Sequence, residues 1–473
     1  MSAQIYRLFG VVVVLFALLV FFTTRWTVID ASKLNNNSLN RLTLVAQLKI
    51  KRGRILADDG TTVLAKSVPA GGGTWKRVYP TGSLFAQAIG YSNVLQGSAA
   101  GLELAAGSYT RGLQTGLSSI FGQLTPTRTG DDVHTTLDPK AQQVAQQQLG
   151  GRAGSVVAID PRTGAVKVMY ANPGYDNNNP PPKGPGTSFN RSTQAGYPPG
   201  STFKVVTATA AIDSGQYTAS SSVNGNSPVT ISGVPLSNDG NQSWGNVDLT
   251  TALTYSINTV WAQVAEHLGI GTMTKYMQRF GFYSRPPLDY PPDELNISRP
   301  FGPNGRPYRP GSPDQDIGRI GIGQGGLLVT PLQMAMVAAA VANGGKLMVP
   351  HMTARVVNKD GVTVKTITPS VYSQVMKPST AQALTQMMTR VVEEGTGTAA
   401  QLGGISVAGK TGTASIGAPG SNLTEPWFIG FAPVQDPKIA VAVTVEQTSG
   451  GFGGTVAAPI AKNVIQTLLS EGQ

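Results

Sequence analysis

The strongest single constraint on this chain is an uncharged apolar run near its N-terminus. Residues 8–24 read LFGVVVVLFALLVFFTT, with Arg7 before the run and Arg25 and Trp26 directly after it. A run of this length lies within the range for a helix that crosses a bilayer, and flanking arginines with an interfacial tryptophan are typical of its ends. We therefore predict one transmembrane helix, with residues 1–25 as cytoplasmic tail and membrane anchor.

A cleaved signal peptide is the alternative interpretation of the same run. The run is longer than a usual signal core, and no small-x-small cleavage motif follows it promptly. No later segment is long and apolar enough to span a membrane again. The anchor is therefore favoured, and residues 26–473 are expected on the extracytoplasmic side, although one arginine on each flank gives only a weak charge asymmetry.

Composition limits the chemistry that the body of the protein can use. The chain has 473 residues, 40% of them apolar, which suggests two or three domains with a sizeable core. It has no cysteine, so disulfides and thiolate metal sites are excluded. Its three histidines, His134, His267 and His351, are far apart in sequence and are expected to be structural. Zinc hydrolysis and a Ser-His-Asp triad are disfavoured, and no metal or cofactor is predicted.

The net charge of +11 raises the question of an anionic partner. The basic residues are spread along the chain, and no module that alternates aromatic and basic residues stands out. A nucleic-acid partner is therefore not predicted. Attraction to anionic envelope polymers or to phospholipid headgroups fits the charge equally well.

The N-terminal part of the body is expected to be rich in β-structure. A polar, Asn-rich segment at 28–41 is typical of a linker, and short β-like runs with Gly and Asp turns continue from Lys51 to a helix at 138–149. That helix is interpreted as a boundary element. We predict an N-terminal pedestal domain over residues 26–150.

Residues 151–473 are predicted to form one larger domain of the α/β (α+β) class. A hairpin at 154–176 turns at Pro161 to Gly164, and an Asn- and Pro-rich loop at 177–186 follows, which is expected to be too polar to pack. Helical patterns cover 247–269 and 330–345; strand-like runs cover 407–415, 426–434 and 438–447; an amphipathic helix covers 458–472. This order implies an antiparallel sheet assembled from both ends of the domain, with helices on its faces.

The stretch GYPPGSTFKVVTATAA, residues 196–211, places Ser201 and Lys204 at the start of a predicted helix. Residues i and i+3 share a helix face, so the Lys204 amine can lie beside the Ser201 hydroxyl. The pair is then a nucleophile with a candidate base. The simpler alternative is that Ser201 is a helix N-cap, since Pro and Gly upstream of a capping serine are ordinary.

Two further short motifs follow in a particular order. Ser256 and Asn258 form an S-x-N motif, and Lys410, Thr411, Gly412 and Thr413 form K-T-G-T on a predicted strand. Each motif alone is weak, because Ser256 and Asn258 could be polar residues at a helix start and Lys410 could lie on an ordinary strand edge. The order S-x-x-K, S-x-N, K-T-G is much more specific.

With these motifs the sequence resembles the penicillin-binding proteins and serine β-lactamases, and most closely the class B penicillin-binding proteins of the actinobacterial penicillin-binding protein A group. Further stretches match that class: RGRI at 52–55, DDGTTVLA at 58–65, GLE at 101–103, NRSTQAGYPPGSTFK at 190–204, IGQGGLLVTPLQMA at 322–335, EEGTGTA at 393–399 and WFIGFAP at 427–433. The resemblance implies a five-stranded antiparallel sheet flanked by helices, with a dimerisation-type pedestal.

The resemblance also implies a role for each motif residue. Ser201 would attack the penultimate D-Ala carbonyl of a peptidoglycan stem peptide, and Lys204 would be the base, its pKa lowered toward roughly 7 to 8 by burial and by Lys410. Ser256 would relay a proton to the leaving amine and Asn258 would hold Lys204 and the substrate amide. Lys410, Thr411, Gly412 and Thr413 would bind the terminal carboxylate. The N–H groups of Ser201 and Thr413 would form the oxyanion hole.

The implied function is a membrane-anchored D,D-transpeptidase that cross-links stem peptides and is inhibited by β-lactams. Its expected partner is a multi-spanning glycosyltransferase of the shape, elongation, division and sporulation family, because no glycosyltransferase domain is found in this chain. A D,D-carboxypeptidase or β-lactamase is one alternative, and a non-catalytic β-lactam sensor or scaffold is another.

The stretch PDELN at 292–296 bears on the hydrolase alternative, because it nearly matches the Glu-x-x-Leu-Asn of class A β-lactamases. It has Pro292 in the glutamate position, although Asp293 or Glu294 could substitute. A second glycine-rich stretch, GIGQGG at 321–326, lacks an acidic residue at the spacing of a dinucleotide site and is interpreted as close backbone packing.

Overall fold

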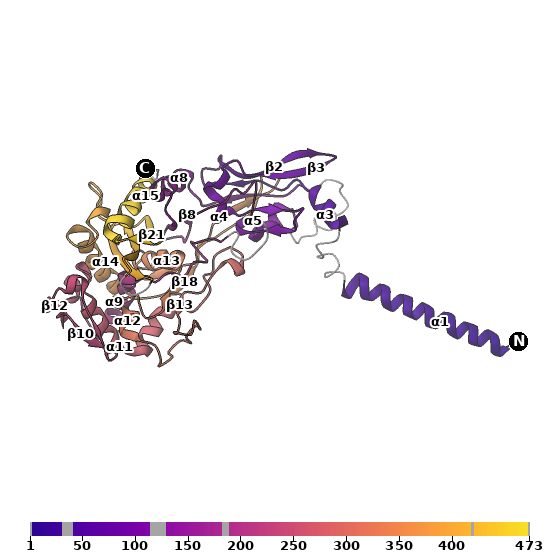
Figure 1. Cartoon of the computed structure of the whole chain (residues 1–473). Helices are drawn as coiled ribbons and strands as arrows, with labels where there is room; N and C mark the ends of the chain where they lie inside the picture. Colours follow the sequence, from indigo (N-terminus) through magenta and orange to yellow (C-terminus); the bar gives the residue numbers. More distant parts are fainter. Residues whose placement is uncertain (1, 31–40, 114–128, 182–188, 418–420, 472–473) are drawn as a thin grey trace.

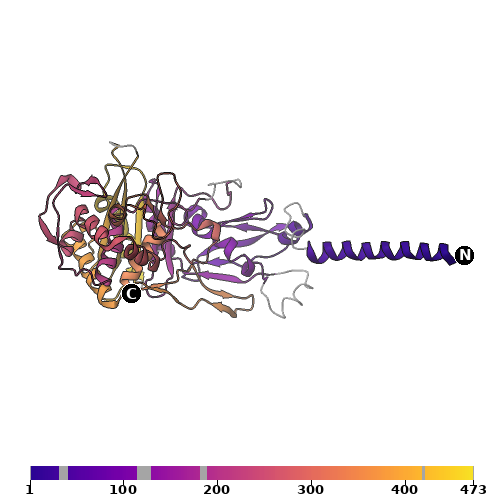
Figure 2. The same ribbon diagram turned by 90° about the horizontal axis from the view of Figure 1, so that it is seen from below.

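The computed structural model describes residues 2–30, 41–113, 129–181, 189–417 and 421–471. The molecule is elongated, with α1 (Ser2–Thr24) at one end, an N-terminal sheet in the middle and the larger domain at the far end (Figures 1 and 2). Most of the predicted linker at 28–41 lies outside the described residues, as does the end of the loop predicted at 177–186.

The apolar run forms a continuous helix that is longer than predicted. A short π-helical segment, Arg25–Ile29, extends α1, because apolar residues continue after Arg25. The most apolar 18-residue window within Ala3–Ile29 has a mean hydropathy of 2.6, and none of that window is buried. Within the described residues this is the one helix long and apolar enough to cross a membrane.

The pedestal sheet combines strands from two distant parts of the sequence. Its order is β17 (Thr363–Thr366), β16 (Thr353–Val357), β6 (Asp132–Thr135), β1 (Ile55–Leu56), β2 (Val63–Gly71) and β3 (Thr74–Val78). β1 and β6 pair in parallel, and the other pairs are antiparallel. Strands β16 and β17 come from residues that we predicted to lie in the larger domain. Their pairing with β6 joins segments more than 200 residues apart, which a local pattern does not encode.

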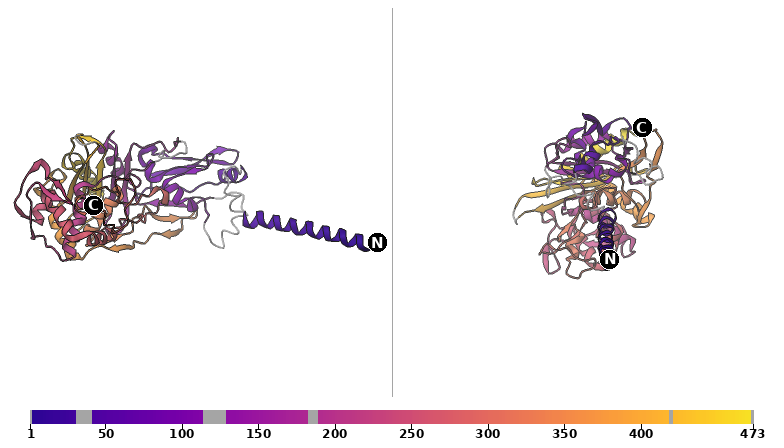
Figure 3. Two further views of the ribbon diagram at one scale, coloured as in Figure 1. Left: turned by 60° about the horizontal axis from the view of Figure 1, so that its bottom comes forward. Right: turned by 90° about the vertical axis from the view of Figure 1, so that its right-hand side faces the viewer.

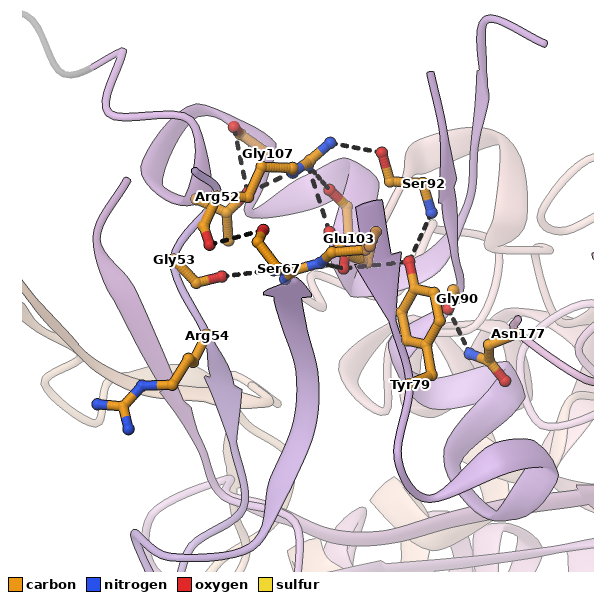
Figure 4. Close-up of polar contacts among 12 residues, drawn as sticks. Arg52, Gly53, Arg54, Ser67, Tyr79, Gly90, Ser92, Glu103, Gly107 and Asn177 are labelled. Carbon is orange, nitrogen blue, oxygen red and sulfur yellow. Dashed lines mark hydrogen bonds and ion pairs between the residues drawn. The ribbon is translucent and has the colours of Figure 1, made fainter. Parts of the chain in front are cut away.

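A buried ion cluster connects the pedestal strands with the GLE segment in α5 (Gly101–Ala105), as Figure 4 shows. The Arg77 Nε donates to Glu103 Oε1 at 2.5 Å, and Arg52 Nη2 lies 3.3 Å from Glu103 Oε2. The Tyr79 hydroxyl donates to the same carboxylate at 3.2 Å. Burial raises the pKa of Glu103, but the charges of Arg77 and Arg52 outweigh it and hold the pKa below its ordinary value.

We expect Glu103→Gln to destabilise the pedestal by about 3–5 kcal/mol, because it leaves two buried guanidinium groups without their counter-charge. Denaturant unfolding of the purified protein measures this loss. Glu394→Gln is the matched control, since Glu394 pairs with Arg390 on an exposed helix face and such pairs contribute little. Equal losses in the two variants would contradict the prediction.

The larger domain is organised around the predicted antiparallel sheet. Its order is β19 (Ala408–Ile416), β20 (Leu423–Ala432), β21 (Ile439–Val445), β7 (Gly154–Ile159) and β8 (Val166–Asn172), and the two-residue β22 (Thr448–Ser449) adds to β20. The first hairpin and the last three strands therefore meet in one sheet. This confirms the predicted five-stranded sheet and the α+β class.

Alternate residues of the strands face two different helical layers, as expected for a sheet covered on both sides. Val157 and Ala442 belong to a core shared with α9 (Lys204–Asp213), α11 (Asn258–Arg279), α13 (Pro331–Ala342) and α14 (Pro378–Glu393). Val156 and Val441 face the other side, toward α8 (Pro139–Leu149) and α15 (Ala458–Glu471). Figure 3 shows these layers from two further directions. Helix α8, predicted as the end of the pedestal, packs on the larger domain's sheet.

The loop that we expected to be too polar to pack is partly buried. The Asn178 side chain donates to Tyr79 O and accepts from Tyr79 N, each at 2.9 Å, and Asn177 donates to Gly90 O (Figure 4). The expectation was wrong for Asn177, which is buried. Asn178 stays exposed, although its side-chain amide supplies both a donor and an acceptor to the Tyr79 backbone.

The remaining elements are short. In the pedestal they are α3 (Arg41–Leu48), η2 (Gly82–Phe85), α4 (Ala86–Ile89), β4 (Ser92–Asn93), β5 (Ser98–Ala99) and α6 (Gly107–Thr110). In the larger domain they are η3 (Gly200–Phe203), β9 (Ser222–Asn224), β10 (Val229–Ile231), β11 (Val234–Leu236), η4 (Asp239–Asn241), β12 (Asn246–Asp248), α10 (Leu249–Thr254), η5 (Pro292–Glu294), β13 (Arg299–Pro300), α12 (Ile317–Gly321), β14 (Leu327–Leu328), β15 (Lys346–Met348), β18 (Val371–Gln374), η6 (Thr398–Ala400) and η7 (Gly453–Ala457).

Candidate active site

Ser201 lies in a short 3-10 turn, η3, that leads directly into α9. The residue at the N-cap position of η3 is Pro199, and the Ser201 hydroxyl caps no backbone N–H. The simple capping interpretation of Ser201 is therefore wrong. The Ser201 side chain is half-buried, and among the described residues it has no hydrogen-bond partner, so its hydroxyl is available for other chemistry.

Two glycines allow other backbone segments to approach this turn closely: Gly412, which lies in β19, and Gly323. A Cβ on Gly412 would lie 2.8 Å from the Pro199 carbonyl oxygen and 3.1 Å from the Thr202 nitrogen. A Cβ on Gly323, whose φ is +78°, would lie 1.9 Å from the Gly200 oxygen. Neither position accommodates a larger residue without movement. The interpretation of the 321–326 stretch as close backbone packing is confirmed, and this packing lies directly beside Ser201.

Ser256 occupies a strained turn between α10 and α11. Its φ is +60°, in the left-handed region that non-glycine residues rarely adopt and that is often found at functional sites. Asn258 is the first residue of α11, but its side chain does not cap the helix. The Asn258 Oδ1 instead accepts from Lys204 Nζ at 2.6 Å. The turn therefore directs both side chains of the S-x-N motif toward the lysines.

The three motifs meet in one hydrogen-bond network around the Ser256 hydroxyl. Lys204 Nζ donates to the Ser256 carbonyl oxygen at 2.7 Å and to its Oγ at 3.2 Å. Lys410 Nζ donates to the same Oγ at 2.9 Å and to the Thr411 carbonyl at 3.0 Å. The two amines thus share one hydroxyl. No hydrogen bond joins Ser201 and Lys204 in the described part of the chain, although their helical spacing permitted one.

Burial makes the charge of these two amines costly. Both lysine side chains are fully buried. Burial, and then the charge of Lys410, lower the pKa of Lys204 well below its ordinary value, while Asp239 opposes this effect. Burial also lowers the pKa of Lys410, to about 7. The direction agrees with the expectation for Lys204, and a neutral Lys204 beside a titrating Lys410 is a state suited to accepting a proton.

The threonines of the K-T-G-T motif contact segments that the sequence did not connect with them. Thr411 Oγ1 lies 2.5 Å from Thr396 Oγ1, and Thr413 Oγ1 accepts from Gly453 N at 3.1 Å. Thr396 belongs to the EEGTGTA stretch, so a sequence signal for it existed, but its contact depends on the tertiary fold. Both contacts hold the middle of β19 against neighbouring segments, the turn at Thr396 and the start of η7.

A second network missed by the sequence holds the segment before Ser201 to the sheet. The Arg191 Nε donates to Glu446 Oε1 at 2.7 Å, and the Tyr197 hydroxyl donates to the same oxygen. The Tyr197 ring meets Trp427 edge-on, with centroids 6.0 Å apart. Burial, with a contribution from Glu446, raises the pKa of nearby Glu425 to about 7. This network supports the backbone that positions Ser201.

Comparisons with known proteins agree with this geometry. Residues 154–466 match the family model described as penicillin binding protein transpeptidase domain, and residues 52–134 match the penicillin binding protein A dimerisation domain. The peptidoglycan D,D-transpeptidase PbpA of Mycolicibacterium smegmatis is 32% identical over 100% of both chains. PbpA of Mycobacterium tuberculosis is also 32% identical, over 99% of both chains.

Two solved structures extend the likeness to the fold. Penicillin-binding protein A of M. tuberculosis, in a ceftriaxone acyl-enzyme complex, has a TM-score of 0.79 and 30% identity, covering 90% of this chain and 100% of that one. A D,D-transpeptidase domain from Eggerthella lenta has a TM-score of 0.75 and 31% identity, covering 90% and 99%. With full-length relatives and a family match over most of its length, this chain belongs to the penicillin-binding protein transpeptidases, and the full-length relatives named above are PbpA proteins.

Proposed function

We propose that the protein is a serine D,D-transpeptidase that cross-links peptidoglycan stem peptides and is inhibited by β-lactams. Ser201 Oγ attacks the penultimate D-Ala carbonyl, and Lys204 accepts its proton. Through Ser256 this proton passes to the leaving amine of the terminal D-Ala, which departs as the ester forms. An acceptor amine from a second stem peptide then resolves the acyl-enzyme. The observation that carries the proposal is the Ser256 hydroxyl shared by two buried lysines, one of which follows Ser201 by three residues, while the Ser201 hydroxyl has no partner among the described residues.

The other motif residues fit binding roles in this reaction. Asn258 orients Lys204 and is placed to meet the substrate amide. Lys410, Thr411, Gly412 and Thr413 line the strand that would receive the terminal carboxylate. The Ser201 N–H lies in the first turn of η3, where backbone donors lack intrahelical acceptors, and with the Thr413 N–H it is a candidate oxyanion donor.

The structure offers little support for hydrolysis as the main reaction. Of the two acidic residues that could replace a β-lactamase glutamate, Glu294 accepts from the Gly101 N–H at 3.1 Å. Its carboxylate is therefore engaged at the junction with the pedestal. Pro292 itself has no ionisable group. We accordingly expect the penicillin adduct to be long-lived and an amine, rather than water, to be the main acceptor.

Product analysis of the full-length protein in detergent tests the proposal. Incubated with stem pentapeptides that carry a free acceptor amine, it is expected to release D-Ala and to form cross-linked dimers detectable by mass spectrometry, and penicillin is expected to abolish both. Release of D-Ala without dimers would identify a carboxypeptidase. Rapid turnover of penicillin would identify a β-lactamase, and absence of any Ser201 adduct would identify a sensor or scaffold.

Acylation by penicillin is expected to fall as the pH rises above about 7. The pKa of Lys410 in the free protein is about 7, so its ammonium is present below that pH and is lost above it. A cation attracts the penicillin carboxylate and a neutral amine does not. Second-order labelling rate constants between pH 5.5 and 9 measure this fall in the acylation rate. A methyl ester of the same β-lactam should not show this decrease. An identical decrease of the labelling rate at alkaline pH with the ester would contradict the role of Lys410.

We further propose that α1 anchors the protein in the cell membrane with the body on the extracytoplasmic side. The support is its unburied apolar surface, which suits lipid or the helices of a membrane partner such as a glycosyltransferase of the shape, elongation, division and sporulation family. The chain has no cysteine. Asp360→Cys is therefore expected to react with a membrane-impermeant maleimide on intact cells, and Ser2→Cys is not. The reverse labelling would contradict the orientation.

A division into anchor (1–25), pedestal (26–150) and transpeptidase domain (151–473) is also proposed. The two family matches lie on either side of residue 150. Packing adjusts the division at two places: α8 lies on the transpeptidase sheet, and β16 and β17 complete the pedestal sheet. Limited proteolysis that releases stable fragments cut near residue 138, rather than near 150, would favour the packing boundary.

A further inference from the structure

The loop at residues 237–244, called here the rim loop, is held against the turn that carries Ser256. The Asn258 Nδ2 donates to the Ser237 carbonyl at 3.4 Å, and the Thr259 N–H donates to Asn238 Oδ1 at 2.9 Å. At the other end of the loop, the Trp244 ring stacks on Tyr255 with centroids 5.0 Å apart and an interplanar angle of 26°. Three separate contacts thus place the rim loop beside the active-site motif.

Asp239 lies between these contacts and is exposed to solvent. It begins η4, and its carboxylate has no hydrogen bond or ion pair with any described residue. Its neighbour Asn238 is buried and donates to Gly225 O at 3.0 Å and to Gln242 O at 2.9 Å, which fixes the backbone from which Asp239 projects. The Asp239 charge also acts on Lys204, opposing the lowering of its pKa, so the two groups lie close enough to interact.

The charged groups of the motifs provide no attraction for the acceptor amine. The positive charge of Lys410 suits the carboxylate of the donor, but the same charge repels a second cation. An aliphatic acceptor amine is protonated in neutral water and must be brought to this same place. Asp239 supplies the opposite charge, and the Tyr255 ring, 41% exposed and stacked on Trp244 of the same loop, offers an aromatic surface of the kind that attracts ammonium groups.

We propose that Asp239, with the Trp244–Tyr255 stack, forms the subsite that captures the cationic amine of the acceptor stem peptide. The inference rests on the proposed function, because it assigns a place to the acceptor of that reaction. The ligand is an aliphatic primary amine. The exposed Asp239 carboxylate selects this amine over water and neutral nucleophiles.

The captured amine then completes the transfer. After one proton has passed to solvent, the neutral nitrogen attacks the acyl carbon, and a C–N bond forms. The bond between that carbon and Ser201 Oγ breaks, and the second proton lost by the nitrogen returns to Oγ through Lys204. Asp239 takes no proton in this sequence. It acts by raising the local concentration of the amine.

A partition experiment on the full-length protein tests the subsite. A thioester donor acylates Ser201, and glycinamide or methanol competes with water for the acyl group, so mass spectrometry gives the amide:acid and ester:acid ratios. We expect Asp239→Asn to lower the amide:acid ratio about tenfold, the size expected for one charge pair near the surface, and to leave the ester:acid ratio within about twofold. Asp239→Glu should retain most of the amide. Asp360→Asn, an exposed carboxylate in the turn between β16 and β17, is the matched control.

The outcomes separate this inference from the function on which it rests. An amide:acid ratio that is unchanged in Asp239→Asn would overturn the subsite and leave the proposed transpeptidase function intact. Equal falls in the amide and ester ratios would also overturn it, because they would show an effect through Lys204 rather than on the amine. Wild-type protein that forms only acid would overturn the proposed function and the subsite together. Rising salt should weaken the wild-type preference for glycinamide, since Asp239 is exposed.

Discussion

Replacing Ser201 with alanine is expected to abolish covalent labelling by penicillin and to lower transpeptidation by about 10⁶-fold, the loss typical of removing a catalytic serine nucleophile. The expectation follows from the position of Ser201. Its hydroxyl has no structural hydrogen bond among the described residues, so its loss removes chemistry without removing support for the fold. Mass spectrometry of the protein after exposure to penicillin measures the adduct, and thermal unfolding verifies that the variant remains folded.

Ser214→Ala provides the matched control for this variant. Ser214 is exposed at the other end of the same helix, where its hydroxyl donates to the Ala211 carbonyl at 3.2 Å. Labelling of Ser214→Ala should equal that of the wild type. A penicillin adduct on Ser201→Ala, at whatever residue, would show that the nucleophile has been assigned wrongly.

The second large effect is expected at Lys204, where arginine and methionine should both reduce acylation by about 10²–10⁴-fold, the usual contribution of a general base. Arginine keeps a positive charge but cannot give up its proton in a protein, and methionine has no proton acceptor of this kind. If Lys204 served only as a charge, arginine would retain most of the activity. Stopped-flow acylation rates therefore separate the two roles. Lys275→Arg, on the exposed face of α11, is the control.

Replacing Lys204 should not lower the stability of the fold at pH 7, although it lowers the rate of acylation. The folded state lowers the pKa of Lys204, so the unfolded chain binds more protons between that folded pKa and the ordinary lysine pKa, and stability rises with pH across this window. Lys204→Met removes the buried amine. We expect it to be at least as stable as the wild type at pH 7 and to show a smaller rise in stability toward pH 10. A strongly destabilised methionine variant would indicate that the amine is needed for the fold.

Much of the architecture is visible in local patterns. The uncharged run predicted α1, and the strand-like runs on both sides of the turn at Pro161 to Gly164 predicted the β7–β8 hairpin. The apolar pattern that ends at Gly344 and Gly345 predicted α13. Each of these elements depends on neighbours in the sequence, so its pattern is complete within a short window. The same holds for the three motifs, whose residue types carry the chemistry.

Other features depend on contacts between distant segments and left no local trace. The pairing of β16 with β6 spans more than 200 residues, and the burial of Asn177 depends on the backbone of a different domain. The position of α8 is a further example, because its apolar stripe suits either neighbouring domain. Only packing against α15 and β8 assigns it to the larger one.

The sequence by itself determined which groups are available: one hydroxyl and one amine a helical turn apart, a second serine, and a second lysine on a strand. The tertiary structure decided what state those groups are in. Burial lowers the pKa of both lysines, and the charge of Lys410 lowers that of Lys204 further; these effects arise only when helix, turn and strand exclude water around the two amines. Likewise Asp239, one exposed carboxylate among many, became a candidate binding group only when the fold held the rim loop against the turn that carries Ser256.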